Sequence, residues 1–168
     1  VCLSGLELQN IHSTLVRNPS VKLSSNLVLR TSSLFRKVFD RLWLEEFGEL
    51  FYIEADYYWG RREKFKGWRS QIPYYSIILG AGIHVIDLIL WLVRDRPIEV
   101  QAMGNNIATR ETGLQYNSFV AVQLRFASGL VARVSANGGG VHPHFHQLKV
   151  FGTNQTVIHE QNQKSFIT

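Results

Sequence analysis

The sequence predicts an α+β fold, in which a mostly antiparallel, open-faced sheet carries helices on one face. The segment 74–93, YYSIILGAGIHVIDLILWLV, is apolar almost all round and predicts a buried helix. Apolar and polar residues alternate from Phe51 to Tyr58, as is typical of a half-buried strand. Strand-like segments then follow one another after residue 97 with turn residues between them, which favours antiparallel pairing.

The composition fits one globular domain with a hydrophobic core, because 45% of the 168 residues are hydrophobic and 18% are charged. A net charge of +5 permits an anionic ligand such as a nucleotide but does not require nucleic acid. The single cysteine, Cys2, excludes an internal disulfide framework. Residues 74–93 are long enough to span a bilayer, yet Asp87 near their centre and two glycines disfavour insertion. No signal segment begins at Val1. We therefore expect neither a membrane protein nor a nucleic-acid-binding protein.

The first residues predict a helix followed by a strand. Ser4 is a suitable N-cap, and Leu6, Ile11 and Leu15 are spaced to form one buried face before Asn18-Pro19 ends the helix. Residues Val21–Leu29 then predict a strand. A helix followed by a strand is the tail of a βαβ unit, whose parallel partner strands would have to lie upstream. We therefore expect the chain to be a fragment that begins inside a larger α/β domain.

The middle of the chain predicts a helix, a strand and a basic loop. The helix begins at Ser32 or Ser33, runs to about Glu46 and ends at Gly48. In the strand, Phe51, Ile53, Ala55 and Tyr57 face one side, and Tyr52, Glu54, Asp56 and Tyr58 face the other. The loop Trp59–Gln71 is basic, with aromatic side chains between its cations. Residues Tyr57–Arg69 could form a surface for single-stranded nucleic acid, but Glu54, Asp56 and Glu63 interrupt the positive charge.

Two glycines divide the central apolar segment. Gly80 and Gly82 predict a short helix or turn, followed by a longer helix from about Gly82 to Arg94. His84 and Asp87 are three positions apart on that helix and therefore share one face. A histidine and a carboxylate on a buried helix indicate either a packing pair or a chemical site.

The rest of the chain predicts strands. Ser128-Gly129 and Gly152-Thr153-Asn154 are typical of turns between them. The predicted strands are Ile98–Gly104, Ser118–Phe126, Leu130–Asn137, His146–Phe151 and a short one at Thr156–His159.

Three histidines alternate at positions 142, 144 and 146 in the sequence HPHFH. In an extended segment their imidazoles would point to one side and could converge on Zn²⁺ or Ni²⁺. No carboxylate or cysteine is close in sequence, and three glycines precede the segment. We therefore favour a surface loop, with one histidine reaching a substrate cleft, over a metal site.

Several stretches, in this order, resemble the C-terminal region of the glucose–fructose oxidoreductase / inositol dehydrogenase / MocA family. They are VKLSSNLVLRTSSLFRKV (Val21–Val38), FGELFYIEADY (Phe47–Tyr57), GWRSQ (Gly67–Gln71), GAGIHVIDLILWL (Gly80–Leu92) and HQLKVFGTNQTV (His146–Val157). Members of that family have an N-terminal Rossmann domain that binds NAD or NADP and then this substrate-binding and oligomerisation domain. The resemblance makes residues 1–29 the remnant of the Rossmann domain and residues 30–168 the C-terminal α+β domain.

The family's Gly-rich phosphate loop and its Glu-Lys-Pro segment, which carries the active-site lysine, are missing here. Gly80–Gly82 is no substitute, because it lacks the preceding strand and the full spacing of the fingerprint. The resemblance therefore implies that NAD or NADP is bound mainly by a domain absent from this chain. It also implies a cytoplasmic homo-oligomer, a dimer or tetramer built through the sheet face, and a sugar, inositol or sugar derivative as substrate.

The resemblance places a catalytic histidine at His84, since the family has a histidine at this point with an aspartate one helical turn earlier. Gly80 stands at that earlier position, and Asp87 could take over part of the substrate binding. An imidazole titrating near neutrality suits the removal of an alcohol proton as hydride leaves the carbon. The alternative is a buried His84 that is hydrogen-bonded to Asp87 and has only a packing role.

The resemblance puts Asn26 and Arg30 at and just past the end of the last Rossmann strand, near the nicotinamide and the substrate. We expect Asn26 to contact the cofactor and Arg30 the substrate, the alternative being a strand-end amide and a solvated cation. Trp68 and Arg69 offer an aromatic face and a guanidinium that suit a sugar ring or an anionic group, or else they pack within an exposed loop.

Two functions follow. The first is the substrate-binding and oligomerisation part of an NAD(P)-dependent oxidoreductase, inactive as an isolated chain. The second is a non-catalytic interaction module, for which the missing carboxylate at Gly80 would mark lost chemistry.

Overall fold

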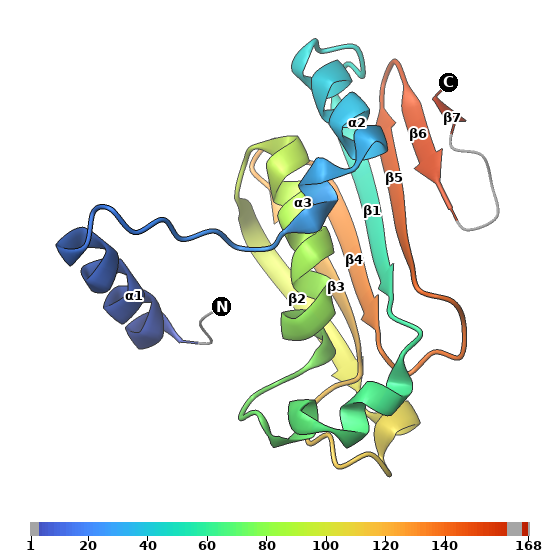
Figure 1. Ribbon diagram of the computed structural model, residues 1–168. Helices are drawn as coiled ribbons and strands as arrows, with labels where there is room; N and C mark the ends of the chain where they lie inside the picture. Colours follow the sequence, from blue (N-terminus) through green and yellow to red (C-terminus); the bar gives the residue numbers. More distant parts are fainter. Residues whose placement is uncertain (1–3, 161–165, 168) are drawn as a thin grey trace.

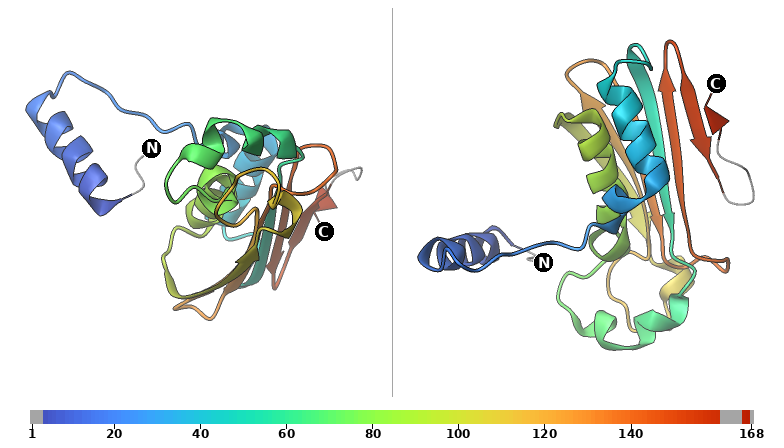
Figure 2. Two further views of the ribbon diagram at one scale, coloured as in Figure 1. Left: turned by 90° about the horizontal axis from the view of Figure 1, so that it is seen from below. Right: turned by 45° about the horizontal axis from the view of Figure 1, so that its top comes forward.

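The computed structural model describes residues 4–160 and 166–167, so Cys2 lies outside the described residues. One mixed sheet forms the body, and two helices pack on one of its faces while the other face stays open (Figures 1 and 2). This arrangement confirms the predicted α+β fold with helices on one side. No helix among the described residues is both long enough and apolar enough to cross a membrane.

The sheet contains seven strands in the order β2-β3-β4-β1-β5-β6-β7. Among the described residues, the central pair, β1 with β4, is parallel, and the other neighbouring pairs are antiparallel. The strands are β1 (Leu50–Tyr58), β2 (Pro97–Asn105), β3 (Phe119–Phe126), β4 (Val131–Asn137), β5 (Phe145–Gly152), β6 (Thr156–His159) and β7 (Phe166–Ile167). The five predicted strands after residue 97 are confirmed as β2 to β6, and β7 was not predicted. The Ser128-Gly129 turn joins β3 to β4, with Gly129 at φ +92°.

The alternation along β1 divides its side chains between the two faces as the sequence predicted. Ile53 and Ala55 are fully buried under the helices, and Tyr57 is also buried there. Their register partners on β4 and β5 continue the same apolar layer across the sheet. The core therefore lies between the sheet and the helix layer.

Helix α3 (Ile83–Val93) is the apolar centre of the helix layer. Val85, Leu88 and Ile89 are fully buried on it, and the left-handed Arg94 (φ 58°) caps its end. The predicted short helix before it is a π-helical turn, η4 (Ile78–Gly82). Gly82 lets this turn approach the sheet closely, since a Cβ there would lie 3.1 Å from the Cβ of Ala136 on β4.

Helix α2 (Ser33–Trp43) buries Phe35 and Val38 against the sheet and ends earlier than the predicted Glu46. Glu45 (φ 57°) already adopts the left-handed conformation that stops the helix, and Gly48 (φ 67°) forms a second bend before β1.

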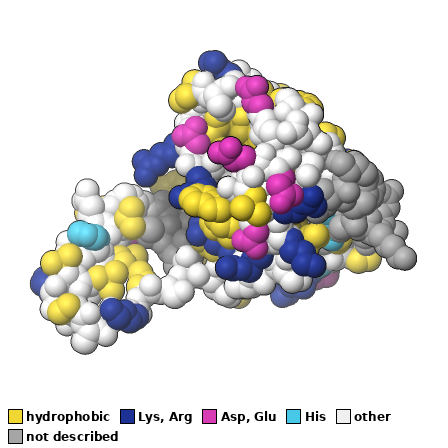
Figure 3. Space-filling model, turned by 90° about the horizontal axis from the view of Figure 1, so that it is seen from above, with side chains coloured by type: hydrophobic (Ala, Val, Ile, Leu, Met, Phe, Trp, Pro, Cys, Tyr) yellow, Lys and Arg dark blue, Asp and Glu magenta, His cyan; other side chains and the backbone are white. Residues whose placement is uncertain are grey.

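Seen from above, the surface of the body has hydrophobic side chains among acidic and basic ones (Figure 3).

The N-terminal prediction is half right. Helix α1 (Gly5–Arg17) forms, and the Ser4 hydroxyl accepts a hydrogen bond from the Glu7 amide, as expected of an N-cap. However, α1 buries none of its residues, and it stands apart from the body at the end of an extended segment (Figures 1 and 2).

The strand predicted at Val21–Leu29 is wrong. Residues 21–27 pair with no strand, and Val28–Thr31 form a single 3₁₀ turn, η1. An isolated strand cannot satisfy its backbone hydrogen bonds, and no neighbouring strand is available to it in the described part of the chain. Of its apolar side chains, Leu29 is buried, whereas Val21, Leu23 and Val28 are exposed.

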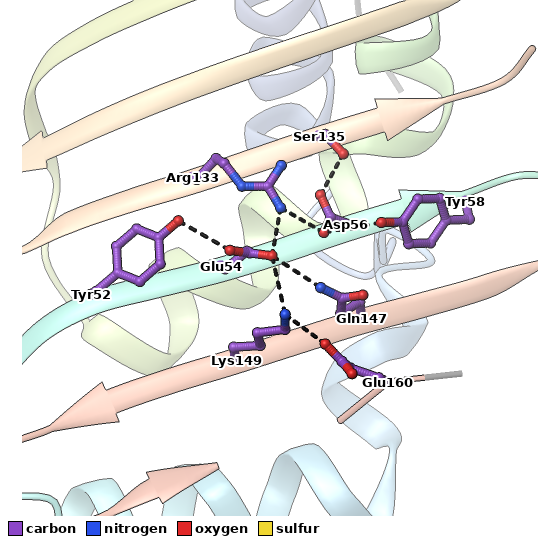
Figure 4. Close-up of polar contacts among 9 residues, drawn as sticks. All are labelled: Tyr52, Glu54, Asp56, Tyr58, Arg133, Ser135, Gln147, Lys149 and Glu160. Carbon is purple, nitrogen blue, oxygen red and sulfur yellow. Dashed lines mark hydrogen bonds and ion pairs between the residues drawn. The ribbon is translucent and has the colours of Figure 1, made fainter. Parts of the chain in front are cut away.

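The open face of the sheet is polar at its centre (Figure 4). Arg133 of β4 binds Glu54 at 2.7 Å and the fully buried Asp56 at 2.8 Å, both on β1. Ser135 also donates to Asp56, and Lys149 of β5 lies 3.6 Å from Glu54. These partners stabilise carboxylates that would otherwise be costly to bury. Charge pairing across three strands thus replaces apolar packing on this face.

Candidate functional site

Three histidines surround one tyrosine on the helix-covered side of the sheet. The Tyr57 ring lies 5.8 Å from that of His84, 5.2 Å from that of His144 and 4.5 Å from that of His146, measured between ring centroids. The two β5-side histidines also meet edge to face at 4.7 Å. We refer to Tyr57, His84, His144 and His146 as the histidine cluster.

The fold places each member of the cluster for a local reason. Tyr57 lies near the end of β1 and faces the helices because of the strand alternation. His146 is its register partner on β5 and therefore faces the same side. His144 precedes that strand, and His84 is in the first turn of α3 above Tyr57. Sequence positions that are far apart thus meet at the N-terminal end of one helix.

Partial burial keeps the histidines of the cluster in their neutral form, because it disfavours the charged imidazolium. Burial lowers the pKa of His84, and the nearby Asp87 carboxylate opposes that shift. Burial also lowers the pKa of His144, and together with neighbouring positive charge it lowers the pKa of His146 to about 4. At neutral pH the cluster is therefore uncharged, and its imidazoles can accept a proton or a hydrogen bond.

His84 has an unused ring nitrogen. Its Nδ1 is buried and has no hydrogen-bond partner among the described residues. The expected bond from His84 to Asp87 does not form, because Asp87 is held by another residue. Arg30 donates to Asp87 through Nε at 2.7 Å and through Nη2 at 2.5 Å, a bidentate ion pair. The alternative in which Asp87 satisfies His84 is therefore wrong.

The Arg30–Asp87 pair also fixes the chain before α2. It joins η1 to α3, and the Arg30 guanidinium lies 6.0 Å from the centroid of the Trp91 ring. Both residues were predicted to bind substrate. They lie together, one turn along α3 from His84, with Asp87 almost covered and Arg30 about half exposed. We call this pair the clamp, because it ties η1 to α3. The substrate-binding role predicted for both residues stays a prediction.

Tyr75 fills the position where the family places an aspartate. A Cβ added at Gly80 would stand 1.9 Å from the hydroxyl oxygen of Tyr75, so no side chain fits there unless Tyr75 moves. Tyr75 is buried, which raises the pKa of its hydroxyl, while Arg69 opposes the shift as a charge and a hydrogen-bond donor. A neutral hydroxyl thus occupies the place of the expected carboxylate, one turn before His84.

Trp68 and Arg69, the predicted pair in the basic loop, differ in their surroundings. The loop folds into two short 3₁₀ turns, η2 (Arg62–Lys66) and η3 (Trp68–Gln71). The Arg69 guanidinium lies over the rings of Trp68 at 4.2 Å and of Trp59 at 5.4 Å. Trp68 is 58% exposed, whereas Arg69 is half-buried and reaches Tyr75. Arg69 therefore adjoins the cluster, and Trp68 offers an open aromatic face beside it.

Asn26 is exposed in the extended segment before η1. The strand that was expected to present it to the cofactor is absent, so its role stays a prediction. The structure brings His84, Arg30, Asp87 and Arg69 around the start of α3 but gives Asn26 no fixed place near them.

The three alternating histidines do not converge on a metal. His142 packs against Tyr58, on the open face, with ring centroids 5.2 Å apart, whereas His144 and His146 pack against Tyr57 on the other face. The Nδ1 of His142 instead bonds the carbonyl of Pro143 at 2.8 Å. No group of three His, Cys, Asp or Glu residues within the described ranges could hold a metal ion. The expectation that one histidine of this segment reaches a substrate cleft stays a prediction.

Sequence reasoning missed Tyr57, Tyr75 and, as a pair, His144 with His146. The alternation of β1 had placed Tyr57 on the helix side, but nothing in the sequence showed which residues would cover it. Tyr75 could have been found only by asking which large side chain fills the space above Gly80, a question of three-dimensional packing.

A family model described as the GFO/IDH/MocA C-terminal domain matches residues 35–158. The chain belongs to this family. The match covers α2, α3 and the sheet from β1 to β6, which confirms the resemblance drawn from the sequence. No curated protein matches the chain significantly.

Solved structures share the GFO/IDH/MocA fold with this chain at low identity. The myo-inositol 2-dehydrogenase of Lactobacillus plantarum superposes with a TM-score of 0.83 at 20% identity, over 92% of this chain and 47% of that one. The scyllo-inositol dehydrogenase of Lactobacillus casei, solved with NAD(H) and scyllo-inositol, gives 0.77 at 16% identity over 93% and 47%. An inositol dehydrogenase homologue of Azotobacter vinelandii, complexed with NADH and myo-inositol, gives 0.79 at 14% identity over 99% and 47%.

This chain therefore spans about half the length of the dehydrogenases that it resembles. Its described residues contain no Gly-rich turn between a strand and a helix, which is the unit that binds a dinucleotide pyrophosphate. The residues present thus do not fit the pyrophosphate of NAD or NADP.

Proposed function

We propose that this chain is the substrate-binding part of an NAD(P)-dependent oxidoreductase that acts on a sugar, an inositol or a sugar derivative. The proposal extends the domain boundary predicted from the sequence, with residues 30–168 as the substrate domain and residues 1–29 as the end of a nucleotide-binding domain. Family membership and the fold of the inositol dehydrogenases support it.

One observation carries the proposal. His84 has a buried Nδ1 without a partner, at the start of a helix, against an aromatic ring and beside two further imidazoles. A histidine with only a packing role would have its ring nitrogens satisfied, because an unpaired buried polar atom costs about 1–3 kcal/mol. Its expected packing partner, Asp87, is bound by Arg30 instead.

In the proposed reaction, a secondary alcohol of the substrate becomes a ketone. His84 in its neutral form accepts the hydroxyl proton as the C–H bond breaks. A nicotinamide cofactor bound by another domain would supply the acceptor for the hydride. The lowered pKa of His84 keeps the base free of a proton at neutral pH. His144 and His146 are placed to hydrogen-bond neighbouring hydroxyls, and the Trp68 ring offers a face for the sugar.

We further propose a homo-oligomer in the cytoplasm that is built through the open face of the sheet. Phe119 and Ala121 are half-buried there on β3, next to the polar network of β1 and β4. A face of a sheet that lacks a helix layer must meet either water or a partner. Light scattering that finds only a monomer at high concentration would contradict this part of the proposal.

The test uses the enzyme together with its nucleotide-binding domain. If His84 is the base, His84→Ala lowers kcat for the alcohol substrate by roughly 10²–10⁴, the usual contribution of general acid–base catalysis. The KM changes less, and the melting temperature stays close to that of the parent. The exposed His12 on α1 provides the control, because His12→Ala removes an imidazole far from the cluster. A His84→Ala enzyme with normal turnover would favour the non-catalytic module instead.

A further inference from the structure

A basic pocket lies at the end of the sheet, between the loop that leaves β1 and the loop that enters β5. Its volume is about 620 Å³, and it is lined by Gly60, Arg61, Arg62, Glu63, Lys64, Gly140, Val141 and His142. Both loops are at the lower end of the sheet in Figure 1.

Backbone contacts hold the two walls of the pocket in place. The Trp59 amide donates to the carbonyl of Asn137 at 2.9 Å, and the side chain of Asn137 accepts from the amides of Gly139 and Gly140. Gly60 adopts φ +59°, and a Cβ there would come within 2.0 Å of the carbonyl oxygen of His142. The walls meet at a point where only glycine fits, so the pocket has a defined shape.

The charge of the pocket is not balanced by the protein. Arg61, Arg62 and Lys64 form no ion pair within the part of the chain that the structure describes. The one acidic residue in the lining, Glu63, is already paired with Lys66 at 2.7 Å. Like charges this close in sequence repel one another, and an anion between them would relieve that repulsion.

Trp59 connects the pocket to the cluster. Its carbonyl oxygen lies 3.3 Å from Nδ1 of His144, and the next residue, Gly60, lines the pocket. The Arg61 charge acts on Tyr57, His144 and His146, three of the four members of the cluster. His84, the fourth member, packs against the Tyr57 ring from α3. A ligand held in the pocket by one end could therefore extend toward His84 with the other.

We propose that this pocket binds a phosphoryl group of the substrate, as in a sugar phosphate or a sugar nucleotide. The assignment rests on the proposed function for the placement of the sugar, but not for the binding of the anion. Three cations suit a phosphoryl group, which carries up to two negative charges, better than a single carboxylate. The planar guanidinium groups of Arg61 and Arg62 match phosphate oxygens in a bidentate manner. The charge of these side chains suits a diphosphate, and the volume of the pocket leaves room for one.

Titration of the chain with pyrophosphate at constant ionic strength, followed by amide NMR shifts, tests the assignment without any turnover. We expect saturable 1:1 binding, with shifts concentrated in residues 60–64 and 140–142. Arg61→Gln with Arg62→Gln should weaken binding about tenfold to a hundredfold, because the anion loses two of its three cationic partners. Arg36→Gln with Arg110→Gln removes the same charge from exposed sites elsewhere and should leave the affinity nearly unchanged.

Gly60→Ala provides a test of shape, because it changes no charge yet forces the walls apart. We expect it to weaken pyrophosphate binding while the spectrum of the sheet stays that of the parent chain. Three outcomes overturn the assignment: no saturation below about 10 mM pyrophosphate, equal weakening by both arginine pairs, or glucuronate binding as tightly as pyrophosphate. A single-stranded oligonucleotide that binds more tightly than pyrophosphate would instead assign the pocket to nucleic acid. If His84→Ala leaves turnover unchanged, His84 is not the base, but the result of the pyrophosphate titration still holds.

Discussion

Replacing Gly80 with aspartate restores the family's carboxylate in the sequence, yet the structure predicts that the chain is destabilised. The Tyr75 ring fills the space that the new side chain would need. An added Cβ would lie 1.9 Å from its hydroxyl oxygen, 2.4 Å from Cζ and 2.8 Å from Cε2. Tyr75 is only 8% exposed, so the ring cannot turn away without disturbing the core around it.

The two opposing effects can be compared in size. Substituting a helical glycine ordinarily stabilises a helix by up to about 1 kcal/mol, because the unfolded chain loses freedom. Gly80 itself is exposed, but the new side chain would be pushed against the buried ring of Tyr75. Such overpacking costs about 1–3 kcal/mol. Asp is a poorer helix former than Ala, so replacing the glycine with Asp stabilises the helix less than replacing it with Ala. We therefore expect Gly80→Asp to lower the free energy of unfolding by about 1–3 kcal/mol, which is roughly 2–12 °C in melting temperature for a chain of this size.

Chemical denaturation followed by circular dichroism measures this loss. Gly67→Ala is the matched control, because the nearest atom to a Cβ at Gly67 is 3.9 Å away. We expect the control to stay within about 0.5 kcal/mol of the parent chain. A Gly80→Asp chain as stable as the parent would show that Tyr75 does not cover Gly80, and the reasoning about the site would fail.

A double-mutant cycle isolates the clash. Tyr75→Ala alone should cost about 3–5 kcal/mol, the usual effect of emptying an aromatic site. The double variant should be more stable than the sum of the single effects predicts, by about 1–3 kcal/mol, because the aspartate then has room. If the enzyme with its nucleotide-binding domain is available, only the double variant tests whether a carboxylate one turn before His84 raises activity.

Three further predictions concern the clamp, the histidine cluster and the cofactor. Asp87→Asn should destabilise the chain by about 1–3 kcal/mol in a urea titration, since Arg30 loses a bidentate partner that is almost covered; an unchanged midpoint would contradict the clamp. The pKa of His146 is lowered to about 4 in the folded chain, so the unfolded chain binds the proton more tightly. The contribution of His146 to the free energy of unfolding should therefore be fully present above pH 6.5. It should fall by about 1–2 kcal/mol, allowing for solvent screening, as the pH drops toward 4. His146→Gln should flatten that dependence in melts across this pH range. Titration calorimetry should detect no binding of NAD(H) or NADP(H) to the isolated chain, because it lacks the phosphate-binding turn; micromolar, saturable binding would place the cofactor site within these residues.

The sequence by itself determined the local elements and their order. Strand β1 and helix α3 were predictable because alternation and continuous apolar character reflect the immediate surroundings of each residue. The turns at Ser128-Gly129 and the N-cap at Ser4 follow from equally local chemistry. The resemblance to the GFO/IDH/MocA family and the choice of His84 as a site residue also required no coordinates.

Only the tertiary structure decided which residues meet. The segment from Val21 to Leu29 has strand-like composition but no neighbouring strand, and pairing is a property of two segments rather than one. Asp87 is adjacent to His84 on one helix face, yet it binds Arg30, because a guanidinium from a distant segment offers two hydrogen bonds. Tyr75 replaces the missing carboxylate over Gly80 through packing that joins residues five positions apart across a turn. Each of these outcomes depends on contacts between segments, which the pattern of a single sequence does not contain.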